Sequence, residues 1–198
     1  LPINETRMIV VVEMRRFNQI EWIDAENYRA GVQAGITGRD LENALNREGF
    51  TSGHEPDSME LSTLGGWIAT NASGMKKNRY GNIEQLVENV TMITPRGVVE
   101  QLQSQPRTSL GIQLQQLAFG SEGMLGFITK AVIRIYRLPE VKKYGSIVFP
   151  DFKTGSDYLY ALKETGVLPA SIRLLDNIQF RFGSALKPRQ SAADRVMN

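Results

Sequence analysis

The chain alternates between short runs of period-two hydrophobicity, which predict β-strands, and amphipathic segments, which predict helices. The β-branched run MIVVVE at 8–13 predicts a buried strand, and YRAGVQA at 28–34 predicts a half-buried one. The predicted strands of the first part lie at 8–13, 17–24, 28–34, 86–93, 98–102 and 127–138. Turn residues fill 24–27, and Pro95 with Gly97 indicates a hairpin between two later strands.

Two helices are predicted between these strands. Thr37 is expected to cap the first, whose apolar stripe contains Leu41, Ala44 and Leu45 before Gly49 ends it. The second is predicted at 111–119 with three apolar side chains facing inward. These are Ile112, Leu114 and Leu117.

The alternation restarts after a polar, proline-containing stretch at 139–143. Beyond it, strands are predicted at 144–149 and 171–175, each followed by a helix, at 151–166 and 176–182. This β-α-β-α run indicates the opening of a second α+β domain.

The longest break in the alternation is Gly53–Gly81, a stretch rich in Gly, Ser, Thr and Asn that predicts a long loop. Loops of this length inside a compact domain are usually functional. Glycines let the backbone approach a ligand closely, and free amides and hydroxyls bind anions. A second glycine-punctuated segment, Gly120–Ile128, follows later. We expect the two segments to converge on a large, planar, phosphate-bearing cofactor.

Composition narrows the classes of function. The net charge is +2, from 23 basic and 21 acidic residues, and no basic block recurs with aromatics, so we predict no nucleic-acid partner. The absence of cysteine excludes disulfides and thiolate sites within these residues. One histidine without a second ligand at useful spacing predicts no metal site. No apolar run reaches the roughly 18 residues that span a bilayer. The start, which lacks Met and enters a strand almost at once, is interpreted as an internal point of a longer protein.

Two side chains are supporting candidates for a catalytic site. His54 lies at the start of the long loop, where it either tunes a bound cofactor or serves as a hydrogen-bonded structural residue. Arg173 lies in an otherwise apolar predicted strand. A buried arginine is costly unless paired, so we expect Arg173 to orient the active site, through Asp176 or the cofactor. The alternative is an arginine at a strand edge that faces water.

Several motifs are long enough to be specific. They are HEPDSMELST at 54–63, TNASGMKKN at 70–78, GSEGMLGFI at 120–128 and PASIRLLDN at 169–177. These motifs closely resemble the alkyldihydroxyacetonephosphate synthase family, flavoproteins that make the ether bond of ether lipids. The looser glycine signals are similar to those of the wider vanillyl-alcohol-oxidase superfamily.

The resemblance implies an α+β fold in two parts. Residues 1–138 would be the later part of a PCMH-type FAD-binding domain that lacks its N-terminal pyrophosphate loop, and 139–198 the truncated beginning of an α+β cap, or substrate, domain. The family's catalytic residues would then lie outside this chain, which alone is expected to be inactive. The cofactor implied is FAD, held without a covalent bond.

The resemblance also implies which residues bind the cofactor. The implied residues are Asp57, Ser58, Met59, Glu60, Leu61, Ser62, Thr63, Thr70, Asn71, Ala72, Ser73, Glu122, Gly123, Met124, Leu125, Gly126, Phe127 and Ile128. Thr63 is expected to approach the isoalloxazine ring. The alternatives are a Ser/Thr-rich surface turn for the first segment and a simple turn acid at Glu122.

In the whole enzyme, the resemblance implies a transferase that replaces the acyl chain of acyl-dihydroxyacetone phosphate with a long-chain fatty alcohol. It implies a peroxisomal homodimer that meets the membrane surface through regions outside this chain. Two alternatives stay open: an FAD-dependent 2-hydroxy-acid dehydrogenase of the same superfamily, and a non-catalytic nucleotide-binding module.

Overall fold

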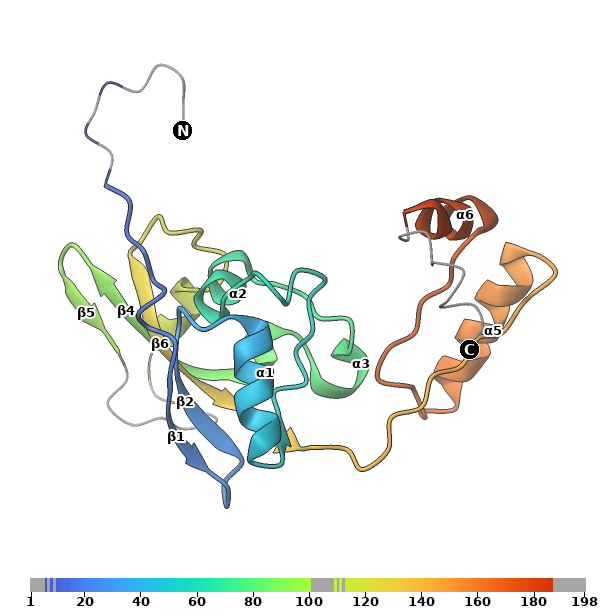
Figure 1. Ribbon diagram of the computed structural model, residues 1–198, viewed down its shortest axis with the longest axis horizontal. Helices are drawn as coiled ribbons and strands as arrows, with labels where there is room; N and C mark the ends of the chain where they lie inside the picture. Colours follow the sequence, from blue (N-terminus) through green and yellow to red (C-terminus); the bar gives the residue numbers. More distant parts are fainter. Residues whose placement is uncertain are drawn as a thin grey trace, which may run out of the picture. The chain divides into compact units, whose positions relative to one another are not determined.

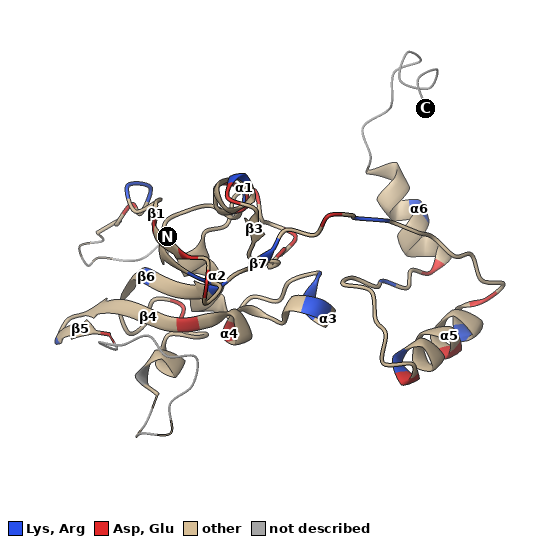
Figure 2. Ribbon diagram, turned by 90° about the horizontal axis from the view of Figure 1, so that it is seen from below, with Lys and Arg blue, Asp and Glu red and all other residues tan. Residues whose placement is uncertain are grey.

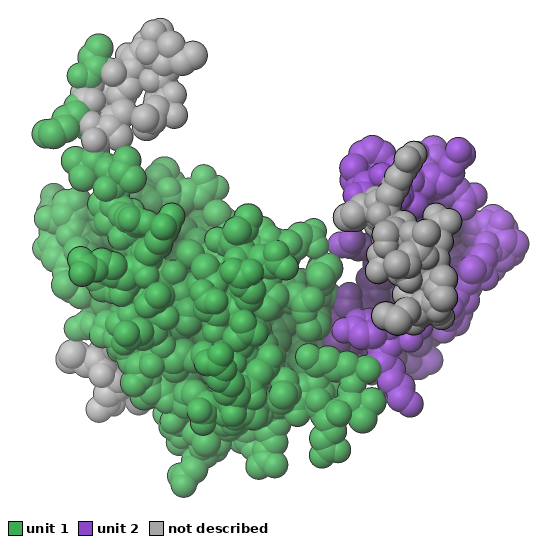
Figure 3. Space-filling view, viewed as in Figure 1, with its two compact units in different colours: residues 1–142 green, residues 143–198 purple. Residues whose placement is uncertain are grey.

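The computed structural model of the chain describes residues 6, 8, 10–100, 109, 111 and 113–186, with Leu114 described by its backbone alone. The chain divides into two compact units, 1–142 and 143–198, which Figure 3 shows in different colours. They are called unit 1 and unit 2. The mixture of helices and strands confirms the α+β fold class.

An antiparallel sheet of five strands forms the frame of unit 1 (Figure 1). In spatial order the strands are β1 (Ile20–Asp24), β2 (Arg29–Gln33), β6 (Phe127–Arg134), β4 (Val87–Thr94) and β5 (Gly97–Val99). Asp24 ties the β1–β2 turn, since its carboxylate accepts hydrogen bonds from the backbone and side-chain nitrogens of Asn27, both at 2.9 Å. The predicted hairpin at 94–97 is confirmed as the β4–β5 turn. Because β6 lies between β2 and β4, the late glycine-punctuated segment is brought beside the first third of the chain.

Short helices and a second, smaller sheet complete unit 1. They are α1 (Gly38–Arg47), α2 (Leu64–Thr70), α3 (Lys77–Tyr80), α4 (Ile83–Leu86), the 3₁₀ helix η1 (Leu114–Leu117), and the paired strands β3 (Phe50–Thr51) and β7 (Tyr136–Arg137). The predicted cap of α1 is confirmed: Thr37 Oγ1 accepts a hydrogen bond from the Asp40 amide at 3.2 Å. Leu41 and Leu45 are fully buried, as their spacing predicts.

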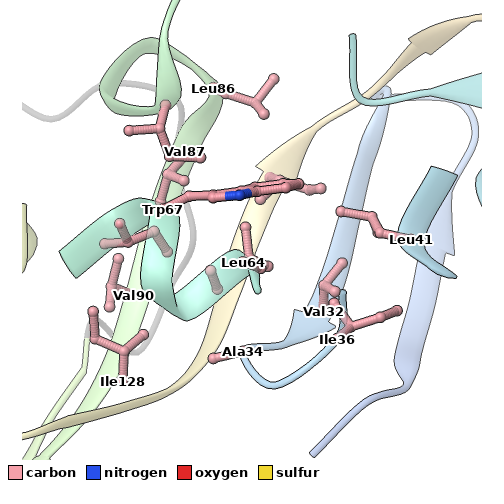
Figure 4. Packing of buried hydrophobic residues seen from close by; sticks show 14 of the residues in the cluster. Val32, Ala34, Ile36, Leu41, Leu64, Trp67, Leu86, Val87, Val90 and Ile128 are labelled. Carbon is pink, nitrogen blue, oxygen red and sulfur yellow. The ribbon is translucent and has the colours of Figure 1, made fainter. Parts of the chain in front are cut away.

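The core of unit 1 lies between one face of the sheet and the helices α1 and α2 (Figure 4). Val32 and Ile133 from the sheet belong to the same buried cluster as Leu64 and Trp67 from α2. Trp67 is 2% exposed, and its indole Nε1 donates to Ser62 Oγ at 2.7 Å. Truncating a buried aromatic of this kind costs about 3–5 kcal/mol. The core therefore anchors α2, and with it the long glycine-rich stretch.

The strand predicted at 8–13 is wrong for the residues that the structure describes. Val10–Glu13 pair with no strand in the described part of the chain, and Val11 is 83% exposed. A β-branched run indicates that a segment fits a pleated surface, but a strand also needs a neighbour for its backbone hydrogen bonds.

The single long strand predicted at 127–138 is two strands. β6 ends at Arg134, and β7 pairs with β3 in the small sheet instead. Ile133 and Ile135 are both buried, so the alternation continues through the point where the pairing partner changes. Periodicity reports which face is buried and not which strand is the neighbour.

The helix predicted at 111–119 is reduced to the single 3₁₀ turn η1. Leu117 is 52% exposed, so its predicted inward orientation is wrong. Ile112 and the side chain of Leu114 lie outside the described residues. The end of the strand predicted at 98–102 lies outside them too.

The described part of unit 2, residues 143–186, contains two helices, α5 (Phe152–Glu164) and α6 (Asn177–Ala185). Both predicted helices are confirmed, with Asp151 and Asp176 as their caps: each carboxylate accepts a backbone amide hydrogen bond at 2.7 Å. The predicted strands at 144–149 and 171–175 are wrong. Neither segment forms a strand in the described residues, and Val148 is 94% exposed.

Candidate cofactor site

The start of the long glycine-rich stretch is held in place by helix α1. The first amides of a helix have no partner within the helix. In α1 two of them donate to loop carbonyls, Gly38 to Ser62 at 3.0 Å and Arg39 to Met59 at 3.1 Å. Within the loop, the amides of Leu61 and Ser62 both donate to the Ser58 carbonyl. Residues 56–62 are therefore a folded turn anchored to a helix whose apolar face is buried.

The prediction of one continuous loop over Gly53–Gly81 is wrong, because the stretch contains α2 and α3. Thr63 is the N-cap of α2, and its Oγ1 accepts a hydrogen bond from the Gly66 amide at 3.2 Å. Leu64, Trp67 and Ile68 are buried at the i, i+3, i+4 spacing of a helix. This spacing after a threonine cap was the signal in the sequence that could have predicted α2, but the helix has only seven residues.

The two glycine-punctuated segments meet at both ends of α2. At its N-terminal end, the Gly65 amide donates to the Ala34 carbonyl at 2.8 Å, and the Ala34 amide donates to the Thr129 carbonyl at 2.9 Å. At its C-terminal end, the amides of Gly120 and Glu122 donate to the carbonyls of the last α2 residues. Residues 120–129 are thus hydrogen-bonded to α2, the helix that follows the folded turn, either directly or through Ala34.

Most of the residues predicted to bind the cofactor are exposed. The exposed ones are Asp57, Ser58, Glu60, Leu61, Thr70, Asn71, Ser73, Glu122, Gly123, Met124, Leu125 and Phe127. Met59, Ser62, Thr63, Ala72 and Gly126 are half-buried. Ile128 differs, since its side chain is buried in the core beside Val90 (Figure 4) and leaves only its backbone for a ligand. Leu61 and Met124 are 86% and 82% exposed, and exposed apolar side chains in functional loops indicate a binding surface.

The hydroxyl groups of the site divide into used and available ones. Ser62 Oγ donates to the Ser58 carbonyl and accepts from Trp67, and Thr70 Oγ1 donates to the Gly66 carbonyl at 2.9 Å. The hydroxyls of Ser58 and Ser73 have no hydrogen-bond partner within the part of the chain that the structure describes. These two are available to a ligand.

The backbone around the meeting point adopts unusual conformations. Asn71 ends α2 with φ +51°, and Glu122 has φ +45°, in the left-handed region that non-glycine residues rarely occupy. Gly120 and Gly123 also have positive φ, and a Cβ added to either would meet nothing within 4 Å. Turns of this kind bind anions through free amides, but here the amides of Gly120, Glu122 and Met124 already donate to backbone carbonyls.

These features fit FAD. A flavin presents a planar apolar ring, a chain of hydroxyls and a pyrophosphate. The site offers exposed apolar side chains at Leu61 and Met124, available hydroxyls at Ser58 and Ser73, and open space around Gly123. Within residues 10–100 and 113–186, no three His, Asp or Glu side chains come together as a metal ion would require.

His54 lies beneath this surface and not on it. The residue is 2% exposed, its ring packs edge-to-face on Trp67 with centroids 4.9 Å apart, and a Cβ on Gly74 would lie 2.9 Å from its Nδ1. Neither ring nitrogen has a hydrogen-bond partner in the described structure. Burial lowers the pKa of His54 from 6.5 to about 4, and the charge of Glu84 opposes that shift. The ring is therefore neutral at physiological pH, and its nitrogens are closed off from a ligand.

Sequence reasoning missed Glu42, which holds the entrance of the loop. Its carboxylate accepts hydrogen bonds from Thr51 Oγ1 at 2.7 Å, from the Ser52 amide at 2.8 Å, and from Ser52 Oγ. Ser52 Oγ in turn accepts from the His54 amide at 3.2 Å. The only signal in the sequence was an acidic residue next to the apolar stripe of α1. A glutamate on the surface and a glutamate that anchors a loop look the same at that position.

The other catalytic candidate, Arg173, lies in unit 2 on the segment between α5 and α6, and its side chain is exposed. Asp176, its suggested partner, accepts a hydrogen bond from the Gln179 amide as the α6 cap. In the described residues, no helix is both long and apolar enough to cross a membrane.

Comparisons with known proteins agree with this geometry. Residues 3–103 match the family model described as "FAD binding domain", and residues 138–197 match "FAD linked oxidases, C-terminal domain". Alkyldihydroxyacetonephosphate synthase of Caenorhabditis elegans is 48% identical over 94% of this chain and 31% of its own length. The Trypanosoma brucei brucei synthase is 40% identical over 93% and 30%. A solved structure of alkyldihydroxyacetonephosphate synthase has a TM-score of 0.82 and 34% identity, over 96% of this chain and 33% of that one. The chain thus spans about a third of the length of these relatives.

Proposed function

Because the chain belongs to the FAD binding domain family, we propose that it forms the flavin-binding part of an enzyme that makes ether lipids. The complete protein would replace the acyl chain of acyl-dihydroxyacetone phosphate with a long-chain fatty alcohol and release the fatty acid. The observation that supports this proposal is the junction at α2, where hydrogen bonds join two distant segments that carry exposed apolar side chains, available hydroxyls and open glycine positions. The alkyldihydroxyacetonephosphate synthase relatives narrow the reaction.

The proposed roles follow from accessibility. Ser58 and Ser73 would hydrogen-bond the cofactor, Leu61 and Met124 would contact its apolar parts, and the open space at Gly123 would leave room for its phosphates. Thr63 would act chiefly as the α2 cap that fixes this surface. When bound, FAD supplies a ring that can accept and return electrons, while the protein holds the reactants together and excludes water.

We propose non-covalent FAD on the same grounds. The chain has no cysteine, and both nitrogens of its one histidine are buried without access to a ligand. His54 is then a positioning residue that supports the loop from below. Arg173 remains a proposed orienting residue of the cap domain. The homodimer, the peroxisomal location and a membrane contact outside this chain are further proposals that follow from the family resemblance of the motifs, and we expect this chain alone to be inactive.

Cofactor binding can be tested on the full-length protein by its visible absorbance and its FAD content after gel filtration. Replacing Ser58 and Ser73 together by alanine should weaken FAD retention by about tenfold, because each hydroxyl would lose a hydrogen bond to the ligand. Ser146→Ala, at an exposed position of unit 2, is the matched control. Full retention in the double variant would refute these contacts, and a colourless wild-type protein would refute the flavin proposal.

The reaction class needs a separate experiment. The full-length flavoprotein should incorporate labelled fatty alcohol into acyl-dihydroxyacetone phosphate with release of fatty acid and without an electron acceptor. The D-lactate dehydrogenase [cytochrome] 1 of Saccharomyces cerevisiae is 29% identical over 84% of this chain, which favours a 2-hydroxy-acid dehydrogenase as the second candidate. Reduction of an artificial acceptor by a 2-hydroxy acid, without alcohol incorporation, would establish that alternative. Bound FAD with neither activity would favour a non-catalytic module.

A further inference from the structure

The glycine-rich stretch returns to its own start after α2. The carbonyl of Ala72 accepts a hydrogen bond from the Ile83 amide at 3.4 Å, so the chain is held on both sides of residues 73–79. These residues are called the exit segment. The segment carries Ser73, one of the proposed cofactor contacts, and Gly74 is its buried residue while most of the others are exposed. Its position therefore depends on the contacts that it makes with the start of the stretch.

Two backbone contacts hold the exit segment against residues 54 and 55. The Met75 amide donates a hydrogen bond to the Glu55 carbonyl at 2.8 Å. Gly74 lies so close to the same part of the chain that an added Cβ would be 2.9 Å from His54 Nδ1 and 3.1 Å from the Glu55 amide nitrogen. Only a glycine allows two backbones to approach in this way. The start and the end of the stretch are therefore in direct contact.

Glu55 adds an ion pair to these backbone contacts. Its carboxylate pairs with the Lys76 ammonium group, and the two side chains are 32% and 28% exposed. Lys77 and Arg79 follow on α3 and are exposed, so the end of the stretch is basic (Figure 2). Like charges in so short a segment repel one another. Glu55 therefore places an acidic group at the point where the basic exit segment meets the start of the stretch.

We propose that Glu55 is a positioning residue, which holds the exit segment in place through Lys76 and thereby slows the release of the cofactor. Release would require a local opening, in which residues 73–79 separate from residues 54 and 55 and withdraw Ser73 from the cofactor. Helix α2 stays folded in this step, because Trp67 and Ile68 belong to the buried core. The effect on FAD rests on the proposed function, whereas the contact between the two segments does not.

The rate of FAD release from the full-length protein tests this role, and it is measured as the rise of flavin fluorescence after dilution. Glu55→Gln and Lys76→Met should each speed release by about threefold, because opening no longer breaks an ion pair. The matched control is Glu21→Gln, which breaks a pair of similar exposure with Lys130 on another part of unit 1. The control should release FAD at the wild-type rate. Raising the salt concentration should bring the wild type toward the rate of the two variants.

A double variant distinguishes positioning from a direct contact between Lys76 and the phosphates of FAD. Glu55→Gln combined with Lys76→Met should release FAD no faster than either single variant, because all three lack the same ion pair. A direct phosphate contact would instead make Lys76→Met the only single variant with faster release. That result, or effects that multiply in the double variant, would overturn the proposal.

Hydrogen exchange of the full-length protein as purified separates this inference from the flavin proposal. The Met75 amide should exchange about threefold faster in Glu55→Gln and Lys76→Met than in the wild type, and Glu21→Gln should not change it. Faster exchange in a protein that binds no flavin would refute the proposed function but support the role of Glu55 in holding the segment. Unchanged exchange would refute that role, and faster exchange with unchanged FAD release would refute its effect on the cofactor.

Discussion

His54 offers a prediction about acid stability that depends on the loop architecture alone. The change is His54→Gln, which keeps a polar side chain of similar length but cannot take up a proton. In the folded protein the imidazole is enclosed by Trp67, Gly74 and the surrounding loop, and it has no hydrogen-bond partner in the described residues. A proton on this ring would have to be buried with only the charge of Glu84 to favour it.

The size of the effect follows from the pKa. Burial lowers the pKa of His54 from 6.5 to about 4, so the unfolded chain binds a proton at a pH where the folded chain does not. Stability from the neutral ring is present above pH 6.5 and is lost as the pH falls toward 4. The full loss is about 3 kcal/mol, and the part between about pH 7.5 and about pH 5 is about 2 kcal/mol.

Urea unfolding at about pH 7.5 and about pH 5, followed by tryptophan fluorescence, measures this difference. Other acids titrate equally in both proteins, so the informative quantity is the pH-dependent loss in the wild type minus that in His54→Gln. We expect about 2 kcal/mol, with the wild type losing more. Equal losses would show that His54 is solvated or paired in solution, and the account of a closed loop would be wrong whatever the stability at neutral pH.

Three other substitutions test the anchoring of the site. Glu42→Gln should destabilise the full-length protein by about 1–3 kcal/mol in urea unfolding, because the carboxylate accepts three hydrogen bonds at the loop entrance. Thr63→Val should cost about 1 kcal/mol by removing the α2 cap, and should lower FAD retention, whereas Thr63→Ser should retain both; an equal effect of the two would exclude the capping role. Gly126→Ala should abolish soluble expression, because the new Cβ would lie 2.2 Å from the Ile93 carbonyl oxygen, while Gly145→Ala, in open space, should express normally.

Local signals in the sequence predicted elements whose causes are themselves local. Thr37 caps the helix that it predicts, Asp151 and Asp176 cap the two helices predicted in unit 2, and the β4–β5 hairpin forms where Pro95 and Gly97 predict it. A cap or a tight turn is decided by a few adjacent residues, so its signal is contained in them.

The wrong predictions concern pairing with distant segments. Residues 8–13 and 144–149 have strand composition but no partner strand among the described residues, and 127–138 changes partner without a change of pattern. The cofactor site shows the same division. Motif spacing identified both glycine-punctuated segments, but the dependence of the first on Glu42 and Trp67 arises from contacts that only the fold creates.

The junction at α2 also predicts how a substitution in the core would affect cofactor affinity. Ala34 has no polar side chain, but its carbonyl accepts a hydrogen bond from the Gly65 amide and its amide donates to the Thr129 carbonyl. It therefore fixes the spacing between the two segments of the proposed cofactor site. Ala34 is 2% exposed, and a Cβ added to Gly65 would lie 3.0 Å from the Cβ of Ala34. A larger side chain at Ala34 must therefore push α2 away from the sheet. Because the exposed residues of both segments are carried by the elements that would separate, cofactor affinity should fall before the fold is lost, although no residue touching the cofactor has changed.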